Sequence, residues 1–322
     1  MEYDELCGHL WKTLYADLDE DETYPNKRPF LAHYTSLEAL EGIVSTNQLW
    51  LSNPLFMNDL EEVRFGINHC ARIFKEHSGI HSALGSDSRV EQFNQHYDYH
   101  IKHYEKEHLF NTYVFCLSEH DPEDYDGNLS MWRGYGGDGS GAAIIFDTNR
   151  IPEISNSPLR LAVVKYGSEE ERLTWFENAA TRFADVVAEL DLPDESLFHT
   201  AFLLFDSSVS YALFSKHIGF RDEKEWRVVY YNILDPAGKL KEFQNYSVTT
   251  RGIEPKLRVP LKHIEGITPE NFSLDEVVDQ ILLGPSSSSE LAIRSIEKML
   301  DVHAKTELKN LIVPTTIPYR KK

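Results

Sequence analysis

The segment from Phe30 to Ser52 limits the folds open to this chain more than any other stretch. It begins with FLAHYTS and ends with QLWLS, two runs whose residue types favour β-strands. The run between them has one apolar helical face, made by Leu37, Leu40, Ile43 and Val44. The segment therefore predicts a strand, a helix and a second strand, and the first strand ends with His33, Tyr34 and Thr35.

Local signals predict where other helices begin. Thr35 with Glu38, Ser168 with Glu171, and Ser287 with Glu290 each place a hydroxyl three residues before a glutamate. This spacing is the capping-box pattern, in which the two side chains satisfy free backbone N–H groups reciprocally. The polar stretch 78–88 predicts a loop, and residues 90–108 predict a very polar helix.

The order of strands and helices favours an α+β fold, because the two kinds of element mix without a regular β-α-β period. Apolar runs predict buried strands at 112–118, 142–146, 226–232 and 277–283. We expect residues 1–29 to form an N-terminal helix (Leu6–Tyr15) and an acidic linker. Residues 30–322 should form a single domain with a helical insertion at about 168–217.

Composition narrows the class of protein. The 322 residues are 41% hydrophobic and 12% aromatic, which is enough for a large core. A net charge of −20 repels nucleic acid at long range, so a nucleic-acid target would need a local basic patch. The three cysteines are widely spaced, and the acidic N-terminus lacks signal-peptide features. No apolar run reaches the length needed to cross a bilayer. These features predict a cytoplasmic protein with no membrane partner.

Two later segments carry residues that could complete a site with His33. In SMWRGY, Ser130–Tyr135, an aromatic ring and a guanidinium stand beside a glycine-rich loop, which suits stacking on a planar ring and pairing with a phosphate. In EKEWR, strand alternation would place Glu223, Glu225 and Arg227 on one face. A carboxylate in a buried strand is costly, which favours a use for it over an exposed ion pair.

Other site motifs fail on spacing or context. The loop GYGGDG at 134–139 matches G-x-G-x-x-G, but it precedes a strand instead of following one, and no Walker lysine is present. The stretch 124–127 lacks the first and last ligands of a calcium loop, and no G-x-S-x-G elbow occurs. One face of the polar helix carries His96, His100, His103 and Glu107, which leaves a zinc site as an alternative. A solvated helix face fits these residues better, and no metal is expected.

Most of the chain resembles a bacterial family known as domain-of-unknown-function family 2971. The resemblance rests on HYTSLE from His33, LSNP from Leu51 with Asn58–Asp59, SMWRGYG from Ser130, GF at 219–220 with EWR at 225–227, GP at 284–285, and IPYR at 317–320. That family in turn resembles the His-Tyr-Glu branch of the ADP-ribosyltransferase superfamily. This second resemblance implies a split mixed or antiparallel sheet with helices packed around it, and NAD as co-substrate.

The resemblance also implies roles for individual residues. His33 would bind a ribose hydroxyl, Thr35 would help to place the carboxamide, and Tyr135, or alternatively Trp132, would stack on nicotinamide. Glu225 would be the catalytic glutamate. Further contacts to NAD would come from Tyr34, Ser52, Asn58, Ser130, Arg133 and Arg227.

The expected function is transfer of ADP-ribose from NAD to a protein or nucleic acid, in a toxin or a phage-defence effector with an antitoxin or defence-system partner. Three alternatives stay open. The chain could hydrolyse NAD, or it could bind NAD or ADP-ribose as a sensor without chemistry. It could also be an interaction protein in which the His33 segment is purely structural.

Overall fold

The computed structural model describes residues 13–14, 24–57, 60–190 and 192–319. Most of the predicted helix Leu6–Tyr15, and the candidate site residue Asn58, lie outside these ranges. The chain forms two compact units. One comprises 1–22, 54–112 and 164–221, and the other 23–53, 113–163 and 222–322. Each is described by itself.

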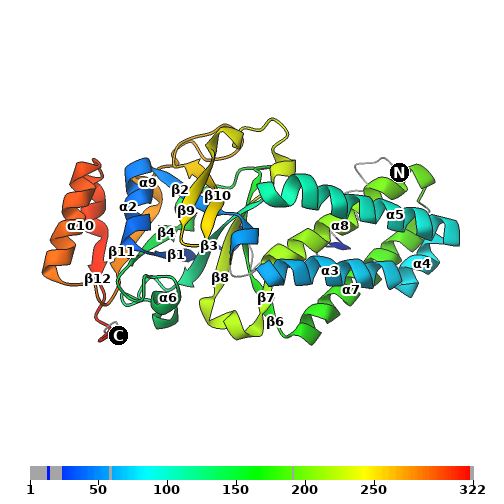
Figure 1. Ribbon diagram of the computed structural model, residues 1–322, viewed down its shortest axis with the longest axis horizontal. Coiled ribbons are helices and arrows are strands. Elements are labelled where there is room, and N and C mark those ends of the chain that lie inside the picture. Colours follow the sequence, from blue (N-terminus) through cyan, green and yellow to red (C-terminus); the bar gives the residue numbers. More distant parts are fainter. Residues whose placement is uncertain (1–12, 15–23, 58–59, 191, 320–322) are drawn as a thin grey trace. The chain divides into compact units, whose positions relative to one another are not determined.

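The second unit is built on a mostly antiparallel sheet, which confirms the α+β class (Figure 1). Its strands run in the order β12-β11-β4-β1-β3-β2-β10-β9, with β8 and then β5 attached to β3. The pair β11–β12 is parallel and the others are antiparallel. The strands are β1 (Phe30–Thr35), β2 (Gln48–Ser52), β3 (Tyr113–His120), β4 (Ala142–Asp147), β5 (Leu159–Val163), β8 (Glu225–Tyr230), β9 (Gln244–Thr249), β10 (Gly252–Pro260), β11 (Val278–Leu283) and β12 (Ile312–Pro314).

Strand β3 organises this sheet because three strands pair with it. Ser118 pairs with Ala32 of β1 and with Glu225 of β8, so these two strands lie on opposite edges of β3. Val114 likewise pairs with β2 on one edge and β8 on the other. Strands β1 and β2 therefore share one edge of β3 at its two ends, and the edge between them is split.

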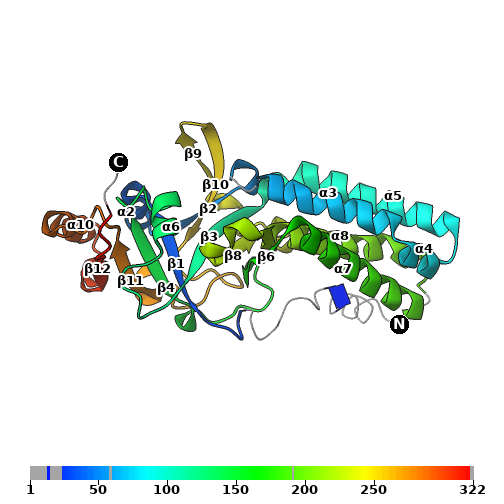
Figure 2. The ribbon, with the colours of Figure 1, turned by 90° about the horizontal axis from the view of Figure 1, so that it is seen from below.

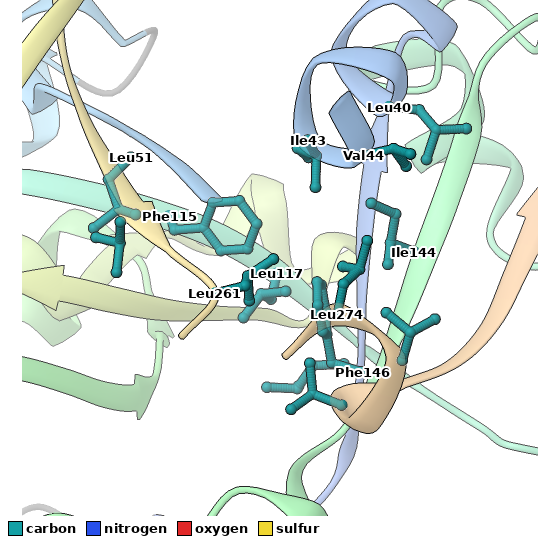
Figure 3. Packing of buried hydrophobic residues seen from close by; sticks show 14 of the residues in the cluster. Leu40, Ile43, Val44, Leu51, Phe115, Leu117, Ile144, Phe146, Leu261 and Leu274 are labelled. Carbon is teal, nitrogen blue, oxygen red and sulfur yellow. The ribbon is translucent and has the colours of Figure 1, made fainter. Parts of the chain in front are cut away.

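One face of the sheet carries the main hydrophobic core of this unit. The strand-helix-strand segment predicted from the sequence is present, with α2 (Leu37–Thr46) between β1 and β2. Figure 3 shows Ile43 and Val44 of α2 facing Phe115 and Ile144 of the strands. Burying such side chains stabilises the fold by about 1.5–3 kcal/mol each.

The opposite face carries a smaller core around α6 (Leu129–Gly134). Met131 and Trp132 of this helix pack on Tyr34 and on small side chains of β1 and β4. Two more helices belong to the unit, α9 (Leu274–Val277) and α10 (Glu290–Val302). Figure 2 shows the β9–β10 hairpin, which extends from the end of the sheet opposite β12.

The first unit is helical. It contains α3 (Leu60–Glu76), α4 (Ser78–Leu84), α5 (Asp87–His103), α7 (Glu169–Leu190) and α8 (Leu197–Phe214), with the short parallel pair β6 (Lys165–Gly167) and β7 (Ser215–His217). The predicted helical insertion at 168–217 falls here, together with residues 54–112. The long helices lie beside one another in Figure 1.

The segment Asp194–Phe214, which contains α8, corrects one expectation, because it is long and apolar enough to cross a membrane by length and composition. The most apolar window of this segment is 56% buried inside the protein, as in a core helix. Its buried residues include Leu204, Phe205 and Leu213.

The predicted capping boxes had mixed outcomes. That of Ser168 and Glu171 is confirmed, since each side chain accepts the other's backbone N–H, at 3.2 and 2.7 Å. The prediction for Thr35 was wrong, because Thr35 still pairs with β4 and is extended, so that Ser36 caps α2.

Two other local predictions were also wrong. The cap of α10 is Ser289, because the hydroxyl of Ser287 is used in a bond to the carbonyl of Ser140. The stretch 78–88 is not a loop throughout: it contains α4, whose Ile80 and Leu84 are buried.

Candidate functional site

His33 lies at the point where β1 separates from β3. Its Nδ1 donates a hydrogen bond to the carbonyl oxygen of Cys116, at 3.0 Å, which fixes the proton of the neutral ring on Nδ1. The ring stacks on Phe115 of the main core, with 4.2 Å between ring centroids. Burial lowers the pKa of His33 to about 4, so the imidazole is neutral at physiological pH.

The next residue, Tyr34, points to the other face of the sheet. Its ring meets Trp132 edge-on, and its hydroxyl accepts the backbone N–H of Asn128 at 2.9 Å. Burial raises the pKa of Tyr34 to about 12. Tyr34 thus holds the start of α6 against the sheet, while Thr35 is buried at the end of β1.

Glu225 and Arg227 form a buried bidentate ion pair on β8. Arg227 donates from Nε and from a terminal nitrogen to the two carboxylate oxygens, at 2.8 and 3.0 Å, and both side chains are almost completely buried. The predicted shared face of these two residues is confirmed. Such a pair costs desolvation energy that its own attraction often fails to recover, so a gain in stability alone does not account for it.

Glu223 was predicted to share this strand face with Glu225 and Arg227, and this prediction was wrong. It precedes the strand, and Lys224 between it and Glu225 has a left-handed backbone with φ of 43°. This bend directs Glu223 toward α6, where its carboxylate accepts the hydroxyl of Tyr135 at 2.9 Å. The five residues 223–227 therefore carry both the partner of Tyr135 and the Glu225–Arg227 pair.

The strand register separates His33 from Glu225. Residues that pair directly across neighbouring strands project from the same face, and Ala32, Ser118 and Glu225 form such a row. His33 follows Ala32 and so projects from the opposite face, that of the main core. The predicted imidazole–carboxylate pair across one cleft is therefore not formed, and His33 has a structural position.

The glycine-rich loop has a packing role that the sequence did not show. A Cβ at Gly136 would lie 2.5 Å from the Trp132 ring, and one at Gly141 would lie 2.0 Å from the carbonyl oxygen of Thr35. These glycines let the loop lie directly against the helix and the sheet. At these two positions the loop therefore meets the protein itself.

Trp132 is not placed to stack on a ligand, because its ring is completely buried and its Nε1 donates to the carbonyl of Asp126 at 2.8 Å. Tyr135 is 42% exposed, which makes it the better candidate for stacking. Arg133 is exposed, and its guanidinium lies over the ring of Tyr319, 5.2 Å from the centroid.

The remaining candidate residues lie at different places. Ser130 is exposed on the first turn of α6. Ser52, at the end of β2, accepts a hydrogen bond from Lys256 at 2.9 Å, and Lys256 also pairs with the buried Glu254. Glu254 and Lys256 were not among the predicted site residues, although their alternation in β10 was a signal that could have indicated them.

The zinc alternative has no geometric support. Among the described residues, no group of three or more His, Cys, Asp or Glu side chains is arranged to hold a metal ion. His100, the central member of the predicted face, donates a hydrogen bond from Nε2 to the carbonyl oxygen of Phe198 on α8, at 3.0 Å. His96 and His100 instead take part in aromatic packing of α5 on α8.

The fold and the site define a mixed α+β protein with a mostly antiparallel sheet, a buried Glu–Arg pair, and an exposed tyrosine that is hydrogen-bonded to the glutamate two residues before that pair. Residues 131–228 match the model of a family described as a protein of unknown function (DUF2971). This match supports the family expected from the sequence, and it contains Tyr135 and the EWR motif but not the His33 segment. Neither the curated proteins nor the solved structures gave a match.

Proposed function

We propose that the chain acts on NAD as an ADP-ribosyltransferase, with Glu225 as the carboxylate that stabilises the reacting ribose. The observation that supports this most is that one short segment, 223–227, brings together an oriented buried carboxylate and an anchored aromatic ring. Arg227 fixes the carboxylate of Glu225 in one orientation through two hydrogen bonds. The carboxylate of Glu223 holds Tyr135 by accepting its phenolic hydroxyl, while Tyr135 stays 42% exposed.

The chemistry requires little beyond these groups. The bond between ribose C1′ and the nicotinamide nitrogen breaks, and nicotinamide leaves as a neutral base with the bonding electron pair. The ribose then develops oxocarbenium character, which a carboxylate hydrogen-bonded to a ribose hydroxyl stabilises, by analogy with glycoside cleavage. The acceptor's nucleophilic atom forms the new bond to C1′ and loses its proton to water or to a base on the acceptor.

Tyr135 would stack on the nicotinamide ring, and the exposed Arg133 would pair with the pyrophosphate. His33 no longer has a ribose contact in this proposal. Its side chain instead joins β1 to β3 at the point where the two strands separate, through the hydrogen bond to the carbonyl oxygen of Cys116. The acceptor would be a protein or a nucleic acid, and a role as a toxin or phage-defence effector belongs to the same proposal.

A second candidate is a sensor that binds NAD or ADP-ribose without chemistry. It is favoured by the engagement of both Glu225 oxygens with Arg227, since each oxygen then has one fewer position for a substrate hydroxyl. Hydrolysis of NAD is the third, with water as the acceptor.

The test is nicotinamide release from NAD by the purified full chain, with and without added protein extract or nucleic acid. Glu225→Gln should reduce the rate by about 100-fold, the scale expected when one group that stabilises developing charge is removed. The matched control is Glu254→Gln, because Glu254 is another buried, ion-paired glutamate of the same sheet. Equal losses in both variants would indicate damage to the sheet and refute the catalytic assignment.

Calorimetry with NAD separates the candidates. Binding with turnover that depends on an acceptor supports transfer, and free ADP-ribose formed without an acceptor supports hydrolysis. Binding without turnover supports the sensor. If the parent protein binds neither NAD nor ADP-ribose in calorimetry and releases no nicotinamide, all three are wrong.

A further inference from the structure

The C-terminal segment Thr315–Tyr319 lies across the loops on either side of α6. The backbone N–H and the hydroxyl of Thr316 both donate to the carboxylate of Asp126, at 2.5 and 2.9 Å. The hydroxyl of Tyr319 donates to Asp138 at 2.5 Å. Two carboxylates, one before α6 and one after it, thus bind a segment almost two hundred residues away in the sequence.

The glycine-rich loop is shaped to receive this segment. Gly139 has φ of 80°, and a Cβ there would lie 2.7 Å from Cδ1 of the Tyr319 ring. Asp138, the acceptor of the Tyr319 hydroxyl, also has a left-handed backbone, with φ of 53°. Such a conformation costs free energy for a residue other than glycine, so the contact fixes a loop shape that the local sequence alone disfavours.

The same ring orients an exposed cation. The guanidinium of Arg133 lies over Tyr319, 5.2 Å from the ring centroid, and Arg133 is two residues before Tyr135. On the inner side, the Trp132 indole donates to the carbonyl of Asp126. The segment Thr315–Tyr319 and the core therefore hold the α6 region from two sides, and Arg133 and Tyr135 emerge from it.

We infer that Thr316 and Tyr319 are positioning residues, which fix Arg133 and Tyr135 as a pair that receives an anionic ligand containing a planar ring. This inference rests on the proposed function for the identity of the ligand, NAD. It adds that the binding surface depends on the C-terminal segment. A cation held by an aromatic ring and an anchored tyrosine lose less side-chain entropy when the ligand binds, which raises affinity through preorganisation.

The experiment compares the parent chain with the double variant Thr316→Val/Tyr319→Phe. This variant removes both hydroxyls and keeps the shape of both side chains, including the ring under Arg133. Tyr246→Phe is the control, since Tyr246 is an exposed tyrosine on β9 of the same unit. Amide hydrogen exchange is followed in peptides covering 129–141, and binding of NAD is measured by calorimetry.

We expect exchange in 129–141 to be at least ten times faster in the double variant and unchanged in the control. The Kd for NAD should rise by about tenfold, while the rate of nicotinamide release at saturating NAD stays within twofold, because the two residues act on binding and not on the reacting bond. Unchanged exchange in the double variant would overturn the inference.

The two hypotheses fail separately. If the parent binds no NAD, the proposed function is wrong, and the exchange rates still decide whether the C-terminal segment orders the α6 region. If the parent binds NAD and the double variant exchanges faster but binds NAD as tightly as the parent, the segment is structural only and the inference is wrong.

Discussion

Replacement of His33 by asparagine tests whether this histidine is structural or belongs to a ligand site. In the structure its Nδ1 donates to the carbonyl of Cys116, its ring stacks on Phe115, and burial lowers its pKa to about 4. The side-chain amide of asparagine can make the same hydrogen bond but does not titrate. The variant therefore removes the proton equilibrium and preserves the hydrogen bond to Cys116, although it loses the ring stacking on Phe115.

The magnitude follows from the difference between the folded and unfolded pKa values. An unfolded histidine has a pKa of about 6.5, so the unfolded chain binds this proton more readily than the folded chain does. The contribution of the neutral His33 to the unfolding free energy is fully present above about pH 7.5. It is lost as the pH falls from there toward 4, and below pH 4 the loss levels off. For a folded pKa of about 4, the loss attributable to His33 at pH 5 is about 2 kcal/mol relative to pH 8.

Two measurements check this expectation. The histidine ring resonance that disappears from the proton NMR spectrum of His33→Asn should titrate near 4 in the parent. The difference in unfolding free energy between parent and variant should change by about 2 kcal/mol between pH 8 and pH 5. A resonance that titrates near 6.5, or a difference that does not depend on pH, would refute the structural assignment of His33. Loss of NAD binding in a stably folded variant would also refute it.

Three other substitutions test the site and its supports. Arg227→Met leaves the buried Glu225 carboxylate without its bidentate partner and should lower the unfolding free energy by about 3–5 kcal/mol. The double variant Glu225→Met/Arg227→Met removes both charges and should lower it by less. Urea unfolding measures both variants, and an equal loss in the two would contradict the pairing. Gly141→Ala should lower the unfolding free energy by more than about 4 kcal/mol, because the added Cβ would overlap a backbone oxygen. In the control Gly134→Ala the added Cβ meets no atom within 4 Å, so the unfolding free energy should stay within about 1 kcal/mol of the parent. Similar melting temperatures for the two variants would argue against this packing. Trp132→Phe should cost about 2 kcal/mol through a lost hydrogen bond and lost volume, measured by thermal unfolding, and an unchanged melting temperature would contradict its burial.

Features that depend on near neighbours were predictable from the sequence. Ser168 and Glu171 form their capping box because both partners lie within one helical turn. Glu225 and Arg227 share a face because side chains alternate along any strand, whatever the strand pairs with. The strand-helix-strand order of 30–52 followed from its apolar periodicities.

Features that depend on pairing across the sheet were not predictable. The face to which His33 points relative to Glu225 depends on the register of β1 on β3 and of β3 on β8, and a shift of one residue would reverse it. Capping also failed where tertiary contacts competed: Thr35 stayed in the β1–β4 ladder, and Ser287 bonded Ser140.

The sequence by itself determined the α+β class, the start of α7 at the Ser168–Glu171 capping box, and the common face of Glu225 and Arg227. Tertiary structure alone decided that His33 supports the split edge of β3, that Trp132 is enclosed, and that Tyr319 meets Gly139. The physical reason is range. Backbone periodicity and capping act over a few residues, whereas these contacts join positions about 80 to 180 residues apart, or depend on a register that local composition leaves open.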